Sequence, residues 1–167
     1  MLRRLTTMCL ATMALTAASP PLGHAQGHPT PSVASLKGIS TVYVMVEELP
    51  DGARMLGLSK DAIQTDVELK LRLAGMRVVT EDEGDKISGG AFVYINVNLT
   101  DNASAAGIDV EFDQDALLAR NYEFSPSVTT WFSGFVLANP SAQEIRDRVK
   151  DLVDGFLNAW LSVNPKK

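Results

Sequence analysis

The sequence has 167 residues, of which 46% are hydrophobic, 7% aromatic and 21% charged, and its formal net charge at pH 7 is −5. This composition is too apolar for an intrinsically disordered chain, and its apolar runs are too short for a protein that crosses a membrane several times. The length predicts a single folded domain. An acidic chain without a basic stripe also argues against binding to nucleic acid or to anionic lipid surfaces.

Residues 1–25 have the pattern of a secretory signal peptide. Arg3 and Arg4 precede an uncharged apolar stretch, and Gly23 and Ala25 are small residues at the positions that a signal peptidase recognises. We therefore expect cleavage after Ala25 and a periplasmic or secreted mature protein. The apolar stretch is shorter than the roughly 20 residues that span a bilayer, so we expect no membrane span in the mature chain.

The mature chain is expected to fold without covalent cross-links. Cys9 is the single cysteine of the sequence, and it lies within the predicted signal peptide. Without a disulfide, the hydrophobic core has to stabilise the fold by itself. Residues 26–35 are rich in proline, serine and threonine and are predicted to form a flexible tether, which leaves a single domain at residues 36–164.

The first part of this domain shows a strand, a helix and a second strand. Alternating apolar side chains predict a strand over residues 41–47. Ser59 is a predicted N-cap for a helix with apolar residues on one face, and Gly75 supplies its left-handed stop. A short strand follows at residues 76–79. This order predicts a crossover connection between two parallel strands.

Three further strands are predicted in the second part. Residues 91–100 and 107–113 alternate cleanly and flank turn-forming residues, so they are expected to form a hairpin with matching core faces. The second of these strands is expected to continue past a bulge over residues 116–120. The last strand is predicted at residues 127–137, which are rich in valine, threonine and aromatic residues.

The longest predicted element is a C-terminal helix. Ser141 and Glu144 have the spacing of a capping box, and residues 142–163 then carry a broad apolar stripe. Only the sheet can cover such a stripe. The order β-α-β-β-β-β-α therefore predicts an α+β fold, a two-layer sandwich in which two helices cover one face of a mixed, mostly antiparallel sheet of about five strands.

With both helices on one face, the other face of the sheet is expected to meet water or a partner. Side chains that alternate away from the core give this open face an acidic surface with an aromatic end. Contiguous exposed apolar groups mark contact sites, so the open face or a sheet edge is a candidate site for a protein partner or a homodimer. A merely solvated face is the alternative. The candidate binding residues are Tyr43, Met45, Phe92, Tyr94, Asn96, Asp109 and Glu111.

The sequence contains few residues suited to catalysis. His28 is the one histidine after the predicted cleavage site, so neither a Ser-His-Asp arrangement nor a zinc site is expected. No catalytic residue, metal ligand or cofactor is predicted. Asp109, Glu111 and Asp113 could form a row of carboxylates suited to acid–base chemistry, so a carboxylate-based hydrolase is an alternative to a binding protein.

Two further possibilities follow from single features. Residues 81–85 are strongly acidic and are expected to form an exposed loop, although they match no known calcium-binding loop. A small-ligand carrier would need a cavity between helices and sheet, which Phe156 or Trp160 would line.

Several stretches of the sequence resemble a group of small secreted bacterial proteins of unknown function. They comprise residues 36–39, 42–44, 66–72, 74–76, 145–147 and 164–165. The order of elements, with a helix followed by Ala-Gly and an apolar strand, is also similar to the amino-terminal domain of the Tol-Pal propeller protein and to the curli secretion lipoprotein. The resemblance implies a non-catalytic accessory module of the bacterial cell envelope, and it supplies no functional residues.

Overall fold

The structure is a computed structural model that describes residues 33–165. It contains one five-stranded sheet in the order β2-β1-β3-β4-β5. Strand β1 is parallel to β2 and β3, whereas β4 is antiparallel to β3 and β5. The strands are β1 (Thr41–Val46), β2 (Arg77–Val78), β3 (Phe92–Leu99), β4 (Ala105–Leu117) and β5 (Phe124–Ala138).

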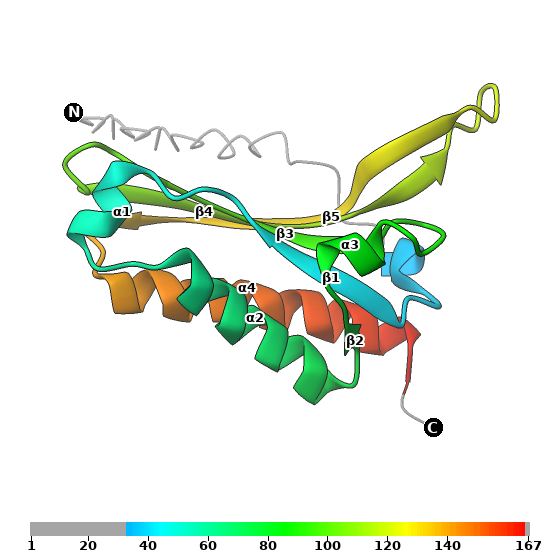
Figure 1. Ribbon diagram of the computed structural model, residues 1–167, viewed down its shortest axis with the longest axis horizontal. Coiled ribbons are helices and arrows are strands. Elements are labelled where there is room, and N and C mark those ends of the chain that lie inside the picture. Colours follow the sequence, from blue (N-terminus) through cyan, green and yellow to red (C-terminus); the bar gives the residue numbers. More distant parts are fainter. Residues whose placement is uncertain (1–32, 166–167) are drawn as a thin grey trace, which may run out of the picture.

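Two long helices, α2 (Lys60–Ala74) and α4 (Ala142–Val163), lie side by side on the same face of the sheet (Figure 1). The predicted α+β class, with a mixed sheet and two helices on one face, is confirmed. No helix within residues 33–165 has both the length and the apolar character that crossing a bilayer requires.

Local capping signals place the starts of both helices. The side chain of Ser59 accepts a hydrogen bond from the Ala62 backbone N–H at 3.2 Å, and Gly75 ends α2 with a φ of 102°. At the start of α4, the Glu144 N–H donates to Ser141 Oγ at 3.2 Å, and the Ser141 N–H donates to Glu144 Oε2 at 2.8 Å. These caps confirm the predicted helix starts because they depend on residues only a few positions apart.

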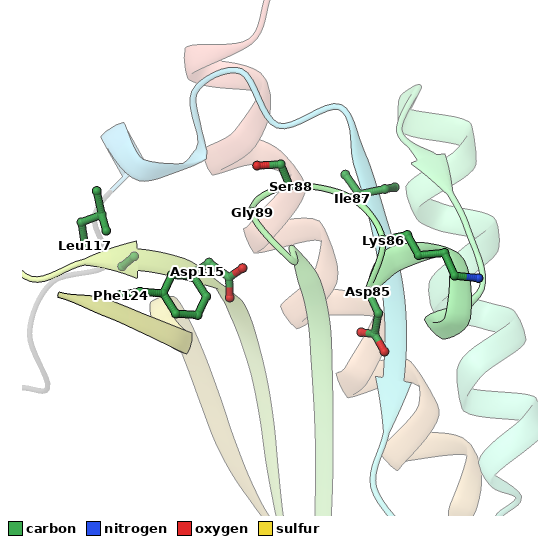
Figure 2. Close-up of a pocket in the computed structure, with 9 residues that line it drawn as sticks. Asp85, Lys86, Ile87, Ser88, Gly89, Asp115, Leu117 and Phe124 are labelled. Atoms are coloured by element: carbon green, nitrogen blue, oxygen red, sulfur yellow. The ribbon is translucent and has the colours of Figure 1, made fainter. Parts of the chain in front are cut away.

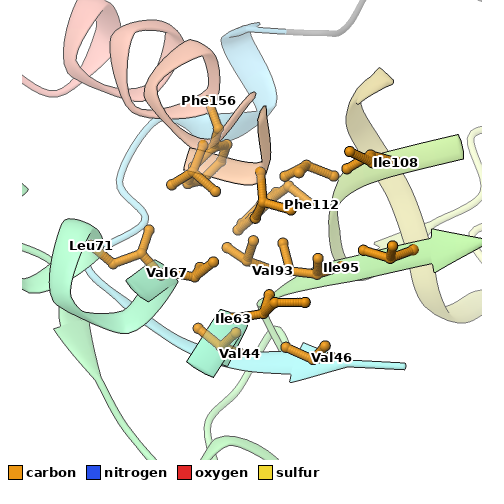
Figure 3. Packing of buried hydrophobic residues seen from close by; sticks show 14 of the residues in the cluster. Val44, Val46, Ile63, Val67, Leu71, Val93, Ile95, Ile108, Phe112 and Phe156 are labelled. Atoms are coloured by element: carbon orange, nitrogen blue, oxygen red, sulfur yellow. The ribbon is translucent and has the colours of Figure 1, made fainter. Parts of the chain in front are cut away.

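The core lies between the sheet and the two long helices (Figure 3). The rings of Phe112 and Phe156 stack at 5.2 Å between centroids, and Trp131 meets Phe156 edge-on at 5.4 Å. The Trp160 indole N–H donates to the Ile39 carbonyl at 2.8 Å. Phe156 and Trp160 are therefore packed as core residues.

The folded domain begins earlier than the sequence pattern predicts. The predicted signal peptide and residues 26–32 of the predicted tether lie outside the described residues. Val33–Leu36 forms a 3₁₀ helix, η1, in which Leu36 is fully buried. The Gln114 side chain donates to the Ser35 carbonyl at 3.2 Å, which attaches η1 to the sheet.

Two short helices lie in the connections between the longer elements. Helix α1 (Asp51–Met55) follows β1, and helix α3 (Glu81–Gly84) lies on the face of the sheet opposite α2 and α4. The prediction of an acidic loop at residues 81–85 is wrong, because Thr80 and Glu83 form a capping box that starts a helical turn. Acidic side chains at the start of a helix interact favourably with its dipole.

The β4–β5 hairpin extends beyond the rest of the sheet (Figure 1). The register between the two strands shifts at Phe112/Asp113 and again at Gln114/Ala116, which confirms the predicted bulge. Past these irregularities the hairpin continues as a two-stranded extension, in which Leu117 is paired with Phe124. We call residues 116–128 the hairpin arm. Bulges bend and twist a strand pair, which accounts for the change of direction.

Candidate functional site

Two of the predicted open-face residues are covered. Tyr43 and Phe92 are expected from the alternation to be exposed, and this is wrong, since they are only 5% and 7% exposed. Their rings stack at 4.9 Å between centroids. Helix α3 covers Tyr43, whose ring lies against Gly84. These two residues therefore support α3 and are not available to a partner.

The other predicted residues keep part of their surface accessible. Met45, Tyr94, Asn96, Asp109 and Glu111 are all half-buried on the open face. The Tyr94 hydroxyl donates a hydrogen bond to the Glu47 carboxylate. This bond raises the pKa of Tyr94 to about 12. The solvent-accessible part of the open face is thus smaller than the sequence predicts, because α3 covers one end of it.

The carboxylates of β4 are partly desolvated. The Thr129 hydroxyl donates to Glu111 Oε2 at 3.1 Å. Asp113 is only 7% exposed, and within residues 33–165 its buried Oδ1 has no hydrogen-bond partner. Burial raises the pKa of both Glu111 and Asp113. Among the described residues, no group of three or more His, Cys, Asp or Glu side chains is arranged to hold a metal ion.

A groove of about 520 Å³ lies between the hairpin arm and the segment after α3 (Figure 2). We call it the arm groove. Leu117 and Phe124 on the arm are 65% and 63% exposed, and Ile87 lies on the opposite wall. The lining residues are Asp85, Lys86, Ile87, Ser88, Gly89, Asp115, Ala116, Leu117 and Phe124.

The backbone of the segment after α3 gives this groove its shape. Gly89 and Gly90 have φ values of 97° and 47°, which other residues adopt only with strain. The Asp115 N–H donates to the Gly89 carbonyl at 2.9 Å and so attaches the segment to the base of the arm. The Asp115 carboxylate lies beside Gly90, where a side chain would crowd it. The two glycines therefore permit a tight turn against β4.

The arm groove combines apolar walls with negative charge. Its carboxylates belong to Asp85 and Asp115. Figure 2 shows the Lys86 side chain directed away from Asp115 and from the Phe124 ring. Lys86 also lines the groove, so a ligand would meet exposed apolar side chains and two acidic groups against one basic group.

The tip of the hairpin arm presents a further aromatic side chain. Tyr122 is 79% exposed and has a φ of 56°, a left-handed conformation that is uncommon for a bulky residue. Its N–H donates to the Leu118 carbonyl at 2.7 Å and closes the turn. Strained residues of this kind are often found at functional sites, which draws attention to the arm.

Sequence reasoning did not identify the arm as a site. Leu117, Tyr122 and Phe124 flank turn-forming residues, a pattern that predicts a hairpin but not whether its apolar side chains are covered. Their exposure depends on how far the hairpin extends beyond the other strands of the sheet. One sequence signal could have identified the arm as a candidate site. Apolar residues lie on both sides of a polar turn, and no other segment is predicted to cover them.

A second groove, of about 340 Å³, lies between β1, α2 and α3. Charged side chains on its α2 wall are already paired within the chain. Lys60 lies 2.6 Å from Glu48, and Arg72 lies 2.8 Å from Glu68. A ligand would have to compete with these ion pairs, so the arm groove is the better candidate site.

No family model matches the sequence, and no curated protein matches it. Among solved structures, this chain matches a chain of a PelC dodecamer from Paraburkholderia phytofirmans, with a TM-score of 0.43 and 10% sequence identity. The match covers 74% of this chain and 89% of the PelC chain. The resemblance to small secreted proteins, the Tol-Pal propeller protein and the curli lipoprotein stays a prediction.

Proposed function

We propose that this protein is a non-catalytic binding module of the bacterial cell envelope, periplasmic or secreted, and that it holds a segment of a partner protein in the arm groove. The observation that carries the proposal is the exposure of Leu117 and Phe124 on a hairpin that projects past the sheet. Large apolar side chains gathered at one exposed place mark interaction sites. Aromatic residues in particular are enriched where binding energy concentrates.

The charge of the groove specifies the chemistry of the partner segment. Asp85 and Asp115 lie at the same groove as the apolar side chains. Complementary charge steers association and disfavours unsuitable partners. The matching segment therefore carries basic side chains beside aromatic or aliphatic ones.

The accessible part of the open face extends this surface. Met45, Tyr94, Asn96, Asp109 and Glu111 share the sheet face of Tyr43, against which α3 packs. In this proposal they contact the partner outside the groove, while Tyr43 and Phe92 hold α3 in place. Homodimer formation through the open face or a sheet edge is part of the same proposal.

A carboxylate-based hydrolase is the second candidate. The raised pKa values of Glu111 and Asp113 favour it, because such shifts cluster at catalytic sites. A hydrolase also needs its substrate held between two carboxyl groups. Neither of the two grooves described above is lined by Asp109, Glu111 or Asp113. The binding function therefore agrees better with the geometry.

Selection of peptides tests the binding proposal directly. The mature protein is immobilised and used to select binders from a random peptide library. We expect enrichment of peptides that combine Lys or Arg with aromatic or aliphatic residues. Binding of these peptides should fall at least about tenfold in a Leu117→Ser/Phe124→Ser double variant, which corresponds to about 1.4 kcal/mol.

Leu73 on α2 provides the matched control, since it is 73% exposed and lies on a different element. A Leu73→Ser variant should bind the selected peptides like the unchanged protein. The proposal fails if no peptide is enriched, or if the Leu117/Phe124 variant binds the selected peptides unchanged. Export is tested separately by cell fractionation and by the N-terminal sequence of the mature chain, which should begin at Gln26.

A further inference from the structure

Strand β5 forms one edge of the sheet, and it is long and uncharged. It contains 15 residues, Phe124–Ala138, and none of them is Asp, Glu, Lys or Arg. Within residues 33–165, β4 is the single strand paired with it. Val136 is 73% exposed. Natural proteins usually protect such edges with charged side chains or by making them short, because an open edge is a template for pairing with another strand.

The backbone groups that β5 leaves open can be identified. The Asn139 N–H donates to the Ser104 carbonyl at 2.7 Å, so Asn139 faces β4. Residues alternate in the direction of their N–H and C=O groups, and the register is regular from Trp131 to Ala138. The backbone groups of Gly134, Val136 and Ala138 therefore point away from β4, toward the open edge.

The opposite edge of the sheet is short and carries charge on the strand itself, whereas the charged side chain over β5, Arg148 at 4.0 Å from the Phe135 ring centroid, belongs to α4. Strand β2 has only two residues, of which Arg77 is exposed. Beyond it, charged side chains of α2, among them Lys60 and Arg72, line the groove beside β1. Pairing of β5 with this edge in another copy would bring these charges against apolar groups. The structure thus favours pairing of β5 with β5 of another copy over pairing of β5 with the β2 edge.

We propose that the edge of β5 around Val136 pairs antiparallel with the same edge of a second copy, so that one sheet runs through both copies. A two-fold axis places a strand opposite itself, so a charged side chain close to the axis would meet its own like charge. The absence of charge from β5 removes this repulsion. Pairing would satisfy the open backbone groups and cover Val136. The left-handed Ser127 and the bulges confine it to the regular half of the strand.

The alternative occupant within this chain is the segment of residues 26–32. It contains Pro29 and Pro31, which have no N–H to donate to a strand ladder. The second copy is therefore the better fit to the edge. This inference specifies the homodimer included in the proposed function, but it uses a different part of the molecule from the arm groove. A monomeric protein would leave the groove proposal intact.

Light scattering on the purified mature chain tests the dimer. We expect twice the monomer mass at micromolar concentrations. Val136→Lys places like charges across the axis and should weaken the dimer at least tenfold, whereas Val136→Thr should leave it unchanged. Val136→Pro removes only an outward N–H, so it should also weaken the dimer while every hydrogen bond to β4 is kept. Circular dichroism melts verify that the variants fold.

Cysteine cross-linking verifies the geometry, because the chain after residue 25 contains no cysteine. Single cysteines at Val136 and Ala138 are oxidised, with Leu73→Cys on α2 as control. At least one β5 position should give a disulfide-linked dimer and Leu73→Cys none. A monomeric unchanged protein, a Val136→Lys variant that dimerises as well as the unchanged chain, or cross-links confined to Leu73→Cys would overturn the proposal.

Discussion

The ring of Tyr43 on β1 lies so close to Gly84 in α3 that a Cβ at position 84 would overlap it. This contact holds α3 on the open face and hides the aromatic end of that face. Burial, together with the nearby carboxylate of Asp85, raises the pKa of Tyr43 to about 12. The same contact determines where the segment after α3 begins, and that segment forms one wall of the arm groove.

A Gly84→Ala substitution is therefore expected to destabilise the protein. Overpacking of a close contact costs about 1–3 kcal/mol, and urea denaturation measures it. In a Tyr43→Val background the added methyl group finds space, so the cost should fall by about half or more. Equal costs in both backgrounds would show that the Tyr43 contact is not what excludes a side chain at position 84.

Gly155 on α4 provides a control, because substitution by alanine is expected to raise the stability of the protein there. A Cβ at this position would meet no atom within 4 Å, and Gly155 is exposed. Gly155→Ala should stabilise the protein by about 0.5–1 kcal/mol, because alanine loses less backbone entropy in a helix. A loss of stability in the same urea experiment would contradict the described packing of α4.

Asp113 is expected to lower the stability of the protein at neutral pH. Its pKa is raised in the folded state by burial, so the ionised form is disfavoured there relative to the unfolded chain. Stability from this group is gained as the pH falls toward the unfolded-state pKa and is lost again as the pH rises through the raised folded-state pKa. Asp113→Asn should therefore stabilise the protein by about 1 kcal/mol at pH 7.

This advantage should shrink as the pH falls through the raised pKa, because both proteins then carry a neutral group at position 113. Thermal melts of the unchanged protein and the Asp113→Asn variant between pH 3.5 and 8 measure the difference. A variant that is less stable at pH 7, or whose advantage is the same at every pH, would show that Asp113 is not held by desolvation.

Tyr122 at the tip of the hairpin arm is expected to lower the stability of the fold and to contribute to peptide binding. Asparagine adopts left-handed backbone conformations more readily than a bulky residue. Tyr122→Asn should therefore leave the melting temperature unchanged or raise it slightly, while the affinity for peptides selected on the unchanged protein falls. Loss of stability without loss of affinity would indicate that the ring serves the fold and not the partner.

Local sequence signals predicted the parts of the fold that depend on neighbouring residues. The caps at Ser59 and Ser141, the stop at Gly75 and the apolar stripe of α4 are all determined within one or a few helical turns. The side-chain alternation of β3 and β4 likewise gave their pairing and core faces. These features were sufficient for the fold class and for placing α2 and α4 on one face.

The candidate site depended on relations that local patterns do not contain. The burial of Tyr43 and Phe92 follows from the position of α3, which is set by a contact between residues 43 and 84. Leu117 and Phe124 are exposed because the β4–β5 hairpin extends beyond the ends of the other strands. Both are tertiary properties, so alternation alone wrongly predicted that Tyr43 and Phe92 are exposed.

The arm groove is tested most directly by a photoreactive amino acid placed at Phe124 in the full chain, expressed in living cells. The account predicts a discrete cross-linked partner at this position, suppressed by the peptides selected in vitro and missing when the same amino acid is placed at Leu73. Failure to cross-link at Phe124, or an equal product at Leu73 that the peptides do not suppress, would contradict it.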